Sequence, residues 1–177
     1  MSERMEFDTV DFITVGTIGP PGQRVFHLQA GQGNQLLTLI IEKEQAASLA
    51  DSIETILAEI EGKLEVVTPP PDPTALDLDL REPILPLFRV GQMGLGYDKD
   101  QDRLILIAGE LLPEDAPDEP RVVRVGATRE QMSILIDHSR QLVAGGRPIC
   151  GNCGQPIDPE GHFCPKSNGH GKRVMWA

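Results

Sequence analysis

The residues of this chain best suited to chemistry are three cysteines and two histidines near its C-terminal end. Cys150 and Cys153 form a Cys-x-x-Cys-Gly turn, and His162-Phe163-Cys164 follows shortly afterwards. Two thiolates on a tight turn can share one metal ion, and tetrahedral Zn²⁺ then needs two further ligands. We therefore predict a structural zinc site, with Cys164 as the third ligand and a histidine as the fourth.

Two histidines compete for the fourth position. His162 stands one residue away from Cys164, so one bent loop could present both side chains, and the spacing favours it. His170 is the alternative, because a turn at Asn168-Gly169 would bring it within reach. Residues 147–177 are too short and polar to form a core of their own, so metal binding would supply their folding free energy.

Other interpretations of the cysteines are weaker. An unstructured tail would leave the compact ligand pairs unexplained. A catalytic zinc would need an open coordination position and a general base, for which Glu160 is the nearby candidate. A redox role for Cys150 and Cys153 would favour a helix start after a strand, and here a helix and Arg147-Pro148 precede the pair.

Composition limits the class of protein. Apolar residues make up 40% of the chain and aromatic residues 4%, which predicts a packed aliphatic core. The net charge of −11 disfavours binding to nucleic-acid backbones. The N-terminus has no secretory pattern, and no apolar stretch is long enough to span a membrane. With its few clustered cysteines, we expect a cytoplasmic protein, whose oligomeric state the sequence leaves open.

An internal repeat is predicted from three matches in the same order. Val15-Gly16 resembles Val90-Gly91, the strand at 25–31 resembles that at 103–109, and the helix at 44–51 matches that at 130–137 without a gap. We therefore divide the chain into a first β-β-β-α repeat at 1–66, a Pro/Asp-rich linker at 67–86, a second β-β-β-α repeat at 87–146 and a zinc-binding tail at 147–177.

The fold class that follows is α+β. Alternating apolar residues predict strands, and three- and four-residue apolar spacing predicts helices at 43–62 and 129–144, with Gly62 as a C-cap and Thr128 with Gln131 as a capping box. The duplicated halves should form an antiparallel sheet with both helices on one face, plus a small C-terminal zinc knuckle. The predicted strands are 8–15, 24–30, 35–42, 87–97, 103–110 and 121–125.

The tail pattern resembles that of an uncharacterised, mainly actinobacterial family of domains of unknown function, and the resemblance extends over the whole chain. It implies no established activity. Because the position of His170 is often aromatic in that family, the resemblance favours His162 as the ligand. The residues that carry it are Arg147-Pro148-x-Cys150-x-x-Cys153-Gly154-x-Pro156-x-Asp158-Pro159-x-Gly161-His162-x-Cys164-Pro165-x-x-Asn168-Gly169.

Function has to be argued without a catalytic signature, because nucleophile-elbow, zinc-protease and P-loop sequences do not occur. We expect a non-enzymatic binding or adaptor protein with a protein partner. A single-stranded nucleic-acid-binding protein is the alternative, because the repeat layout resembles Pur-alpha-type and Whirly-type proteins. A metal-dependent hydrolase is the second alternative.

Several polar residues outside the tail are candidates for binding. His27 is expected on a partly exposed strand and His138 on the solvated face of a helix. Five arginines fall on strands or beside them, and they would form an anion-binding patch if they shared one face; otherwise they are scattered solubilising residues. These are Arg24, Arg89, Arg103, Arg121 and Arg124.

Overall fold

The described part of the chain forms two sheets and a pair of helices, a mixed α+β arrangement. The computed structural model describes residues 3–20, 22–70, 77–145, 162–163 and 173–174. In chain order the elements are β1 (Arg4–Phe7), β2 (Phe12–Ile18), β3 (Val25–Gln32), β4 (Gln35–Ile41), α1 (Lys43–Leu64), β5 (Val90–Asp98), β6 (Arg103–Glu110), β7 (Val122–Ala127), α2 (Arg129–Ala144), β8 (His162–Phe163) and β9 (Arg173–Val174).

The single antiparallel sheet expected from the sequence is wrong. One sheet is antiparallel, in the order β2-β3-β4, and the other is mixed, in the order β1-β7-β6-β5. The mixed character comes from β1, which runs parallel to β7 and places Phe7 opposite Val125. Burial of Phe7 holds this short strand in place. Its polar–apolar alternation covers only four residues, which is too short to predict a strand with its partner.

Corresponding backbone hydrogen bonds connect the segment that leads into each half to the last strand of the other half. The Val10 N–H donates to the Gly126 carbonyl over 3.0 Å. The Leu87 N–H donates to the Thr38 carbonyl over 2.8 Å, and the Ile40 N–H donates to the Phe88 carbonyl over 3.0 Å. The two halves are therefore joined through backbone pairing as well as through side chains.

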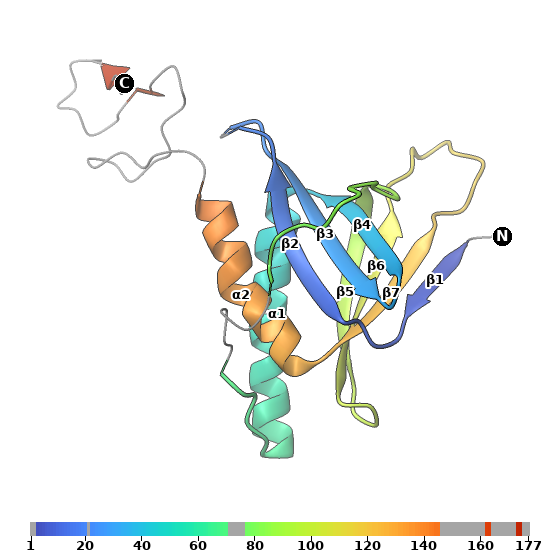
Figure 1. The fold of residues 1–177 in the computed structure, drawn as a ribbon, viewed down its shortest axis with the longest axis vertical. Helices are drawn as coiled ribbons and strands as arrows, with labels where there is room; N and C mark the ends of the chain where they lie inside the picture. The colour runs from blue at the N-terminus through green and yellow to red at the C-terminus, as the bar shows by residue number, and fades with distance from the viewer. Residues whose placement is uncertain (1–2, 21, 71–76, 146–161, 164–172, 175–177) are drawn as a thin grey trace.

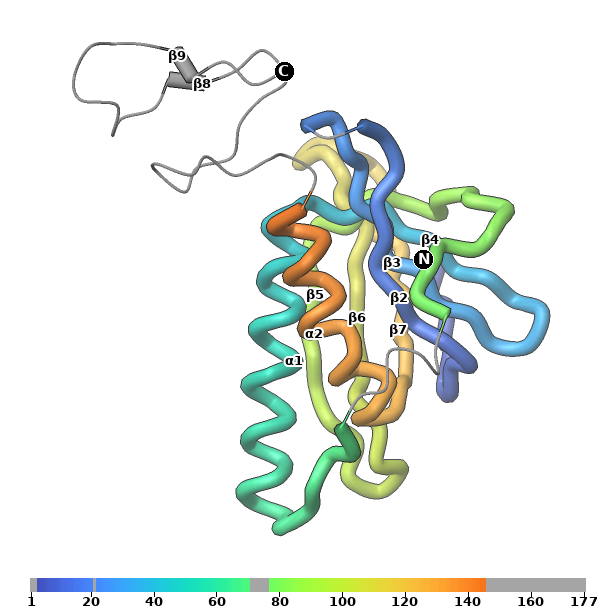
Figure 2. The backbone as a smooth tube through the Cα atoms, turned by 60° about the vertical axis from the view of Figure 1, so that its left-hand side comes forward, coloured from blue at the N-terminus to red at the C-terminus, as the bar shows by residue number. Residues whose placement is uncertain are grey.

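The helices lie side by side along one side of the two sheets (Figures 1 and 2). α2 contacts β2 and α1 contacts β5, so each helix lies against the first long strand of the other half. The inward residues of both sheets and both helices form one apolar cluster, and full burial of each large aliphatic side chain stabilises the fold by about 1.5–3 kcal/mol. Its fully buried members include Val15, Leu28, Leu39, Ile53, Leu104, Leu106, Val123, Met132 and Leu135.

The observed helix ends can be compared with the capping residues predicted from the sequence. The predicted capping box is confirmed: the Gln131 N–H donates to Thr128 Oγ1 over 3.0 Å, and the Thr128 N–H donates to Gln131 Oε1 over 2.8 Å. Gly62 as a C-cap is wrong, because α1 continues to Leu64 and Glu65 takes the left-handed conformation, with φ 53°. None of the described helices is long and apolar enough to cross a membrane.

A glutamine in the first turn of each helix also reaches into the other half. The Gln45 side chain donates to the Val90 carbonyl over 3.1 Å, and the Gln131 side chain donates to the Val10 carbonyl over 3.0 Å. Because buried carbonyl groups need a donor, these bonds fix where each helix starts relative to the neighbouring strand.

The outer face of the first sheet is covered by residues 77–82. Thr14 Oγ1 donates to the Leu78 carbonyl over 2.6 Å. The Gln29 side chain donates to the Arg81 carbonyl over 2.8 Å and accepts from the Arg81 N–H over 2.6 Å. Thr14 and Gln29 are fully buried as a result. This stretch of the predicted linker is therefore packed onto the body, because it satisfies polar strand side chains that would otherwise be orphaned.

Candidate functional site

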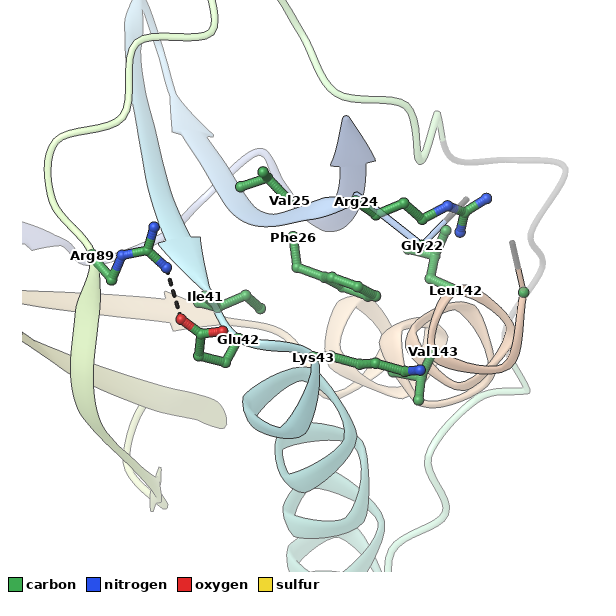
Figure 3. A pocket seen from close by; sticks show the side chains of 11 residues that line it. Gly22, Arg24, Val25, Phe26, Ile41, Glu42, Lys43, Arg89, Leu142 and Val143 are labelled. Carbon is green, nitrogen blue, oxygen red and sulfur yellow. Dashed lines mark hydrogen bonds and ion pairs between the residues drawn. The ribbon is translucent and has the colours of Figure 1, made fainter. Parts of the chain in front are cut away.

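A cavity of about 260 Å³ opens where α1 begins and α2 ends (Figure 3). Three elements supply its cations: Arg24 directly precedes β3, Lys43 is the first residue of α1, and Arg89 directly precedes β5. The cavity therefore depends on residues far apart in the chain that the sheet and helix packing bring together. Its apolar walls are formed by Val25, Phe26, Ile41, Leu142 and Val143.

Arg24 and Lys43 have no carboxylate partner in the part of the chain that the structure describes. The Nε–H of Arg24 is shielded from solvent and has no hydrogen-bond partner there. A Cβ built on Gly145 would lie 3.8 Å from Arg24 Nη1, so the guanidinium reaches the end of α2. This nitrogen is enclosed by the protein, so a ligand in the cavity would meet the guanidinium through its Nη groups.

The third cation of the cavity is paired. Arg89 Nη1 donates to Glu42 Oε1 over 2.7 Å (Figure 3). With three cations and one carboxylate, the cavity has an excess of two positive charges in a chain whose net charge is −11. The last carbonyls of α2 attract nearby cations, whereas the first amides of α1 repel them. The two helix dipoles therefore act on these cations in opposite directions.

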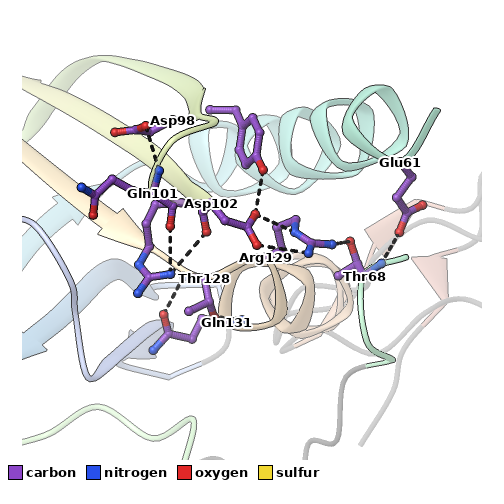
Figure 4. A network of polar contacts seen from close by, with 10 residues as sticks. Glu61, Thr68, Asp98, Gln101, Asp102, Thr128, Arg129 and Gln131 are labelled. Atoms are coloured by element: carbon purple, nitrogen blue, oxygen red, sulfur yellow. Dashed lines mark hydrogen bonds and ion pairs between the residues drawn. The ribbon is translucent and has the colours of Figure 1, made fainter. Parts of the chain in front are cut away.

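The opposite end of the helix pair is closed by polar contacts (Figure 4). Arg129 donates to Asp102 through two bonds, Nε to Oδ1 over 2.9 Å and Nη2 to Oδ2 over 3.2 Å. Tyr97 Oη donates to Asp102 Oδ1 over 2.7 Å. Arg129 Nη1 also donates to Thr68 Oγ1 over 3.2 Å, and the Thr68 N–H donates to Glu61 Oε1 over 2.8 Å.

The pKa shifts in this network follow from its bonds. Hydrogen bonds from Arg129, and then from Tyr97, lower the pKa of the Asp102 carboxyl. The bond to Asp102 raises the pKa of Tyr97 and that of Arg129. The Thr68 N–H lowers the pKa of Glu61. Each shift favours the charge state already present at neutral pH, which is typical of a structural network rather than of an acid–base pair.

Corresponding positions at the two ends carry different charges. Asp102 directly precedes β6 as Arg24 directly precedes β3, and Arg129 begins α2 as Lys43 begins α1. At one end the strand residue is a carboxylate that pairs with the helix residue. At the other end it is an arginine, so the pair is replaced by two cations beside a cavity. This difference makes the cavity the candidate functional site.

The arginines singled out in the sequence do not share one face. Arg24 and Arg89 line the cavity. Arg121 and Arg124 form ion pairs with carboxylates. Arg103 lies on the outer face of the second sheet, where its neighbours along β6 alternate with buried residues. The sequence analysis missed Lys43, because a lysine at the start of a helix is common and only the packing of α2 makes it part of a cavity.

The two histidines of the body are both engaged. His27 is buried instead of partly exposed, its Nδ1 lies 3.0 Å from the Val25 carbonyl oxygen, and burial lowers its pKa. The expected solvated position of His138 is wrong: its Nε2 lies 2.7 Å from the Val15 carbonyl oxygen, so it connects α2 to β2. Donation to that carbonyl requires the proton on Nε2.

The predicted zinc ligands lie outside the described residues, except for the backbone of His162. The ligands outside the described residues are Cys150, Cys153, Cys164 and the alternative His170. His162 falls in β8, opposite Val174 of the antiparallel β9. Among the residues that the structure does describe, no group of three or more His, Cys, Asp or Glu side chains is placed to hold a metal ion.

The chain belongs to a family described as a protein of unknown function (DUF3090), whose model matches residues 5–164. The family resemblance drawn from the sequence is confirmed at this level. No curated protein and no solved structure gave a significant match to the chain. The matched range begins within β1 and extends through β8. It includes all the described residues that line the cavity, so this part of the cavity is built from family sequence.

Proposed function

We propose that this protein is a non-enzymatic binding protein that holds an acidic ligand in the cavity formed by Arg24, Lys43 and Arg89. The observation that carries the proposal is the excess of two positive charges among the described residues that line the cavity. Cations gathered at one cavity of an acidic protein create a local positive potential that attracts anions.

The side chains of the cavity suit binding better than catalysis. Among its described lining residues, the ionisable ones are two arginines, Lys43 and Glu42, which forms an ion pair with Arg89. Histidine, cysteine, serine and tyrosine, the usual general bases and nucleophiles, do not occur among these described residues. They therefore support recognition of a ligand.

An adaptor role with a protein partner is the second part of the proposal, and the outer face of the second sheet supports it. Ile107 of β6 is 42% exposed there, with Arg124 of β7 opposite it in the register. Within the described strands this face has no aromatic side chain on which bases could stack, so it favours a protein over single-stranded nucleic acid. A pull-down in which wild type and Ile107→Asp retain the same proteins would contradict this part.

A structural zinc ion in the tail remains part of the proposal, with Cys150, Cys153, Cys164 and His162 as ligands and His170 as the alternative to His162. The family match includes the first four of these residues and ends before His170, which supports His162. Elemental analysis of the full chain should give about one equivalent of zinc per chain, given four ligands to one ion. A value below about half an equivalent would refute the site.

We also propose that the two halves arose by duplication, with boundaries at 1–66 and 87–146. The matching bonds of Gln45 and Gln131 support this. The strand register modifies the sequence match: Ala30 lies opposite Ile13, and Ala108 lies opposite Met93, so the counterpart of Gly16 is Gly96. Separate profiles of the two halves, built from family sequences, should match each other with this offset; failure to do so would count against duplication.

Thermal unfolding in sodium sulfate and sodium chloride of equal ionic strength tests the binding function. A bound anion stabilises the folded state by mass action, so sulfate should raise the midpoint of wild type by a few degrees more than that of Arg24→Asp. The variant serves as the baseline, because sulfate also stabilises folded proteins nonspecifically. Equal shifts in the two proteins would rule out the cavity as an anion site.

A further inference from the structure

We infer that the cavity binds a small organic phosphate monoester whose phosphate contacts Arg24 and Lys43 and whose body is compact and apolar. This inference rests on the proposed binding function and specifies its ligand. It concerns a free small molecule, because the cavity, at about 260 Å³, lies slightly below the size range usual for drug-sized ligands.

Charge is the first argument for a phosphate monoester. Such a group carries close to two negative charges at neutral pH, since its second pKa is about 6. Two cations of the cavity, Arg24 and Lys43, have no carboxylate partner among the described residues. A carboxylate or sulfonate would neutralise only one of them, whereas a phosphate dianion neutralises both.

Donor geometry is the second argument. The Nε–H of Arg24 is enclosed by the protein, so the phosphate would be bound by the Nη groups of its guanidinium. A guanidinium binds phosphate oxygens through two parallel bonds, and a lysine ammonium adds a point charge from another direction. Figure 3 shows both side chains extending toward the last turn of α2, where Leu142 and Val143 lie.

The walls of the cavity supply the third argument. Val25 is 40% exposed, and Phe26 and Ile41 form the buried floor behind it. Leu142 and Val143 of α2 complete an apolar surface beside the cations. Inorganic phosphate would leave this surface in water, while an organic monoester would cover it and gain the hydrophobic contribution. A long polyanion is disfavoured by the net charge of −11.

The closed end of the helix pair shows that this fold can neutralise the same positions internally. There Asp102 occupies the place of Arg24 and binds the first residue of α2 through two hydrogen bonds. Among the described residues, no carboxylate does for Arg24 what Asp102 does for Arg129. The ligand phosphate is the acceptor for its Nη groups.

The test is calorimetric titration of the full-length protein with phenyl phosphate, inorganic phosphate and benzenesulfonate at low salt. Phenyl phosphate should bind at least about fivefold more tightly than either control, because inorganic phosphate lacks the apolar body and benzenesulfonate lacks the second charge. Arg24→Asp should weaken phenyl phosphate binding at least tenfold, since it loses a charge-assisted contact and adds a repulsive one.

Two further variants keep the result interpretable. Arg4→Asp makes the same change in net charge at a residue that does not line the cavity, and its affinity should stay within about twofold of wild type. Lys43→Gln should weaken binding about fivefold even if Arg24→Asp fails to fold. An equal loss in Arg4→Asp and Arg24→Asp would overturn the assignment of the phosphate to Arg24.

Different results would overturn the phosphate-monoester ligand and the more general proposal of anion binding. If inorganic phosphate or benzenesulfonate binds the cavity as tightly as phenyl phosphate, the phosphate-monoester inference is overturned while anion binding stands. If none of the three ligands binds wild type and sulfate has no specific effect on its stability, both the ligand and the binding function are overturned. Tight phenyl phosphate binding that depends on both Arg24 and Lys43 supports both.

Discussion

The two ends of the helix pair use corresponding positions for different purposes. At the end where α2 begins, Asp102 and Arg129 form a bidentate ion pair that Tyr97 and Thr68 complete (Figure 4). At the end where α1 begins, Arg24 and Lys43 occupy those places beside a cavity (Figure 3). One exchange of charge, from a carboxylate to a guanidinium, therefore separates a structural contact from the proposed binding site.

A comparison of charge compensation at the two helix starts indicates a functional region in a fold without a recognisable catalytic motif. A cation at the start of a helix is unfavourable because it faces the positive end of the helix dipole. Arg129 is compensated by Asp102, and its side chain is only 15% exposed. Lys43 has no such compensation among the described residues. A bound anion would therefore stabilise the protein most at the end of the helix pair where Lys43 lies.

The largest expected effect comes from replacing Asp102, beside the start of α2, with the arginine that occupies the corresponding place beside the cavity. Asp102→Arg removes the bidentate pair and places a third cation beside Arg129 and Arg103, so it should lower the free energy of unfolding by about 2 kcal/mol. Urea denaturation measures this effect. Asp100→Arg is the matched control, because Asp100 lies in the same hairpin and only its backbone N–H is hydrogen-bonded there. An equal loss in both variants would show that the network contributes nothing specific.

The reverse change should have a smaller effect of opposite sign. Arg24→Asp allows a pair with Lys43, so in ligand-free, low-salt buffer it should be as stable as wild type or more stable, by up to about 1 kcal/mol. Urea denaturation at two salt concentrations tests this, because a new ion pair is weakened by screening. A decrease of more than about 1 kcal/mol in the free energy of unfolding would mean that Arg24 stabilises the fold instead of serving a ligand.

The smallest effect is a pH dependence confined to the closed end. Arg129 lowers the pKa of Asp102, so this carboxylate stabilises the fold above its unfolded pKa of about 3.9, and the contribution is lost as the pH falls through the lower folded pKa. Wild type should therefore exceed Asp102→Asn in stability by about 1 kcal/mol or less at pH 6, and the difference should shrink near pH 3. A difference that grows on acidification would contradict the pairing.

The sequence predicted the local elements well and their arrangement only in part. The alternation in 103–110 and the apolar spacing in 129–144 gave β6 and α2 with the observed bounds. The capping box at Thr128 was recognisable because both partners lie within one turn. These features depend on contacts between neighbours in the chain, which a sequence pattern records directly.

Apart from the C-terminal end of α1, the features that sequence reasoning missed depend on distant contacts. The parallel pairing of β1 with β7 joins the N-terminus to the second half, and the covering of Gln29 by Arg81 joins residues 52 positions apart. The cavity combines residues from Arg24 to Gly145. No local pattern distinguishes an arginine that will face a second cation from one that will meet a carboxylate, because the answer depends on how the helices pack.

The central claim is that only one end of the helix pair takes an anion. Nuclear magnetic resonance of the backbone amides during a phenyl phosphate titration tests it most directly. The account predicts progressive, saturable shifts for Arg24, Lys43 and the last turn of α2, with little change at Asp102 and Arg129. Equal shifts at both ends, or none at the Arg24 end, would contradict it.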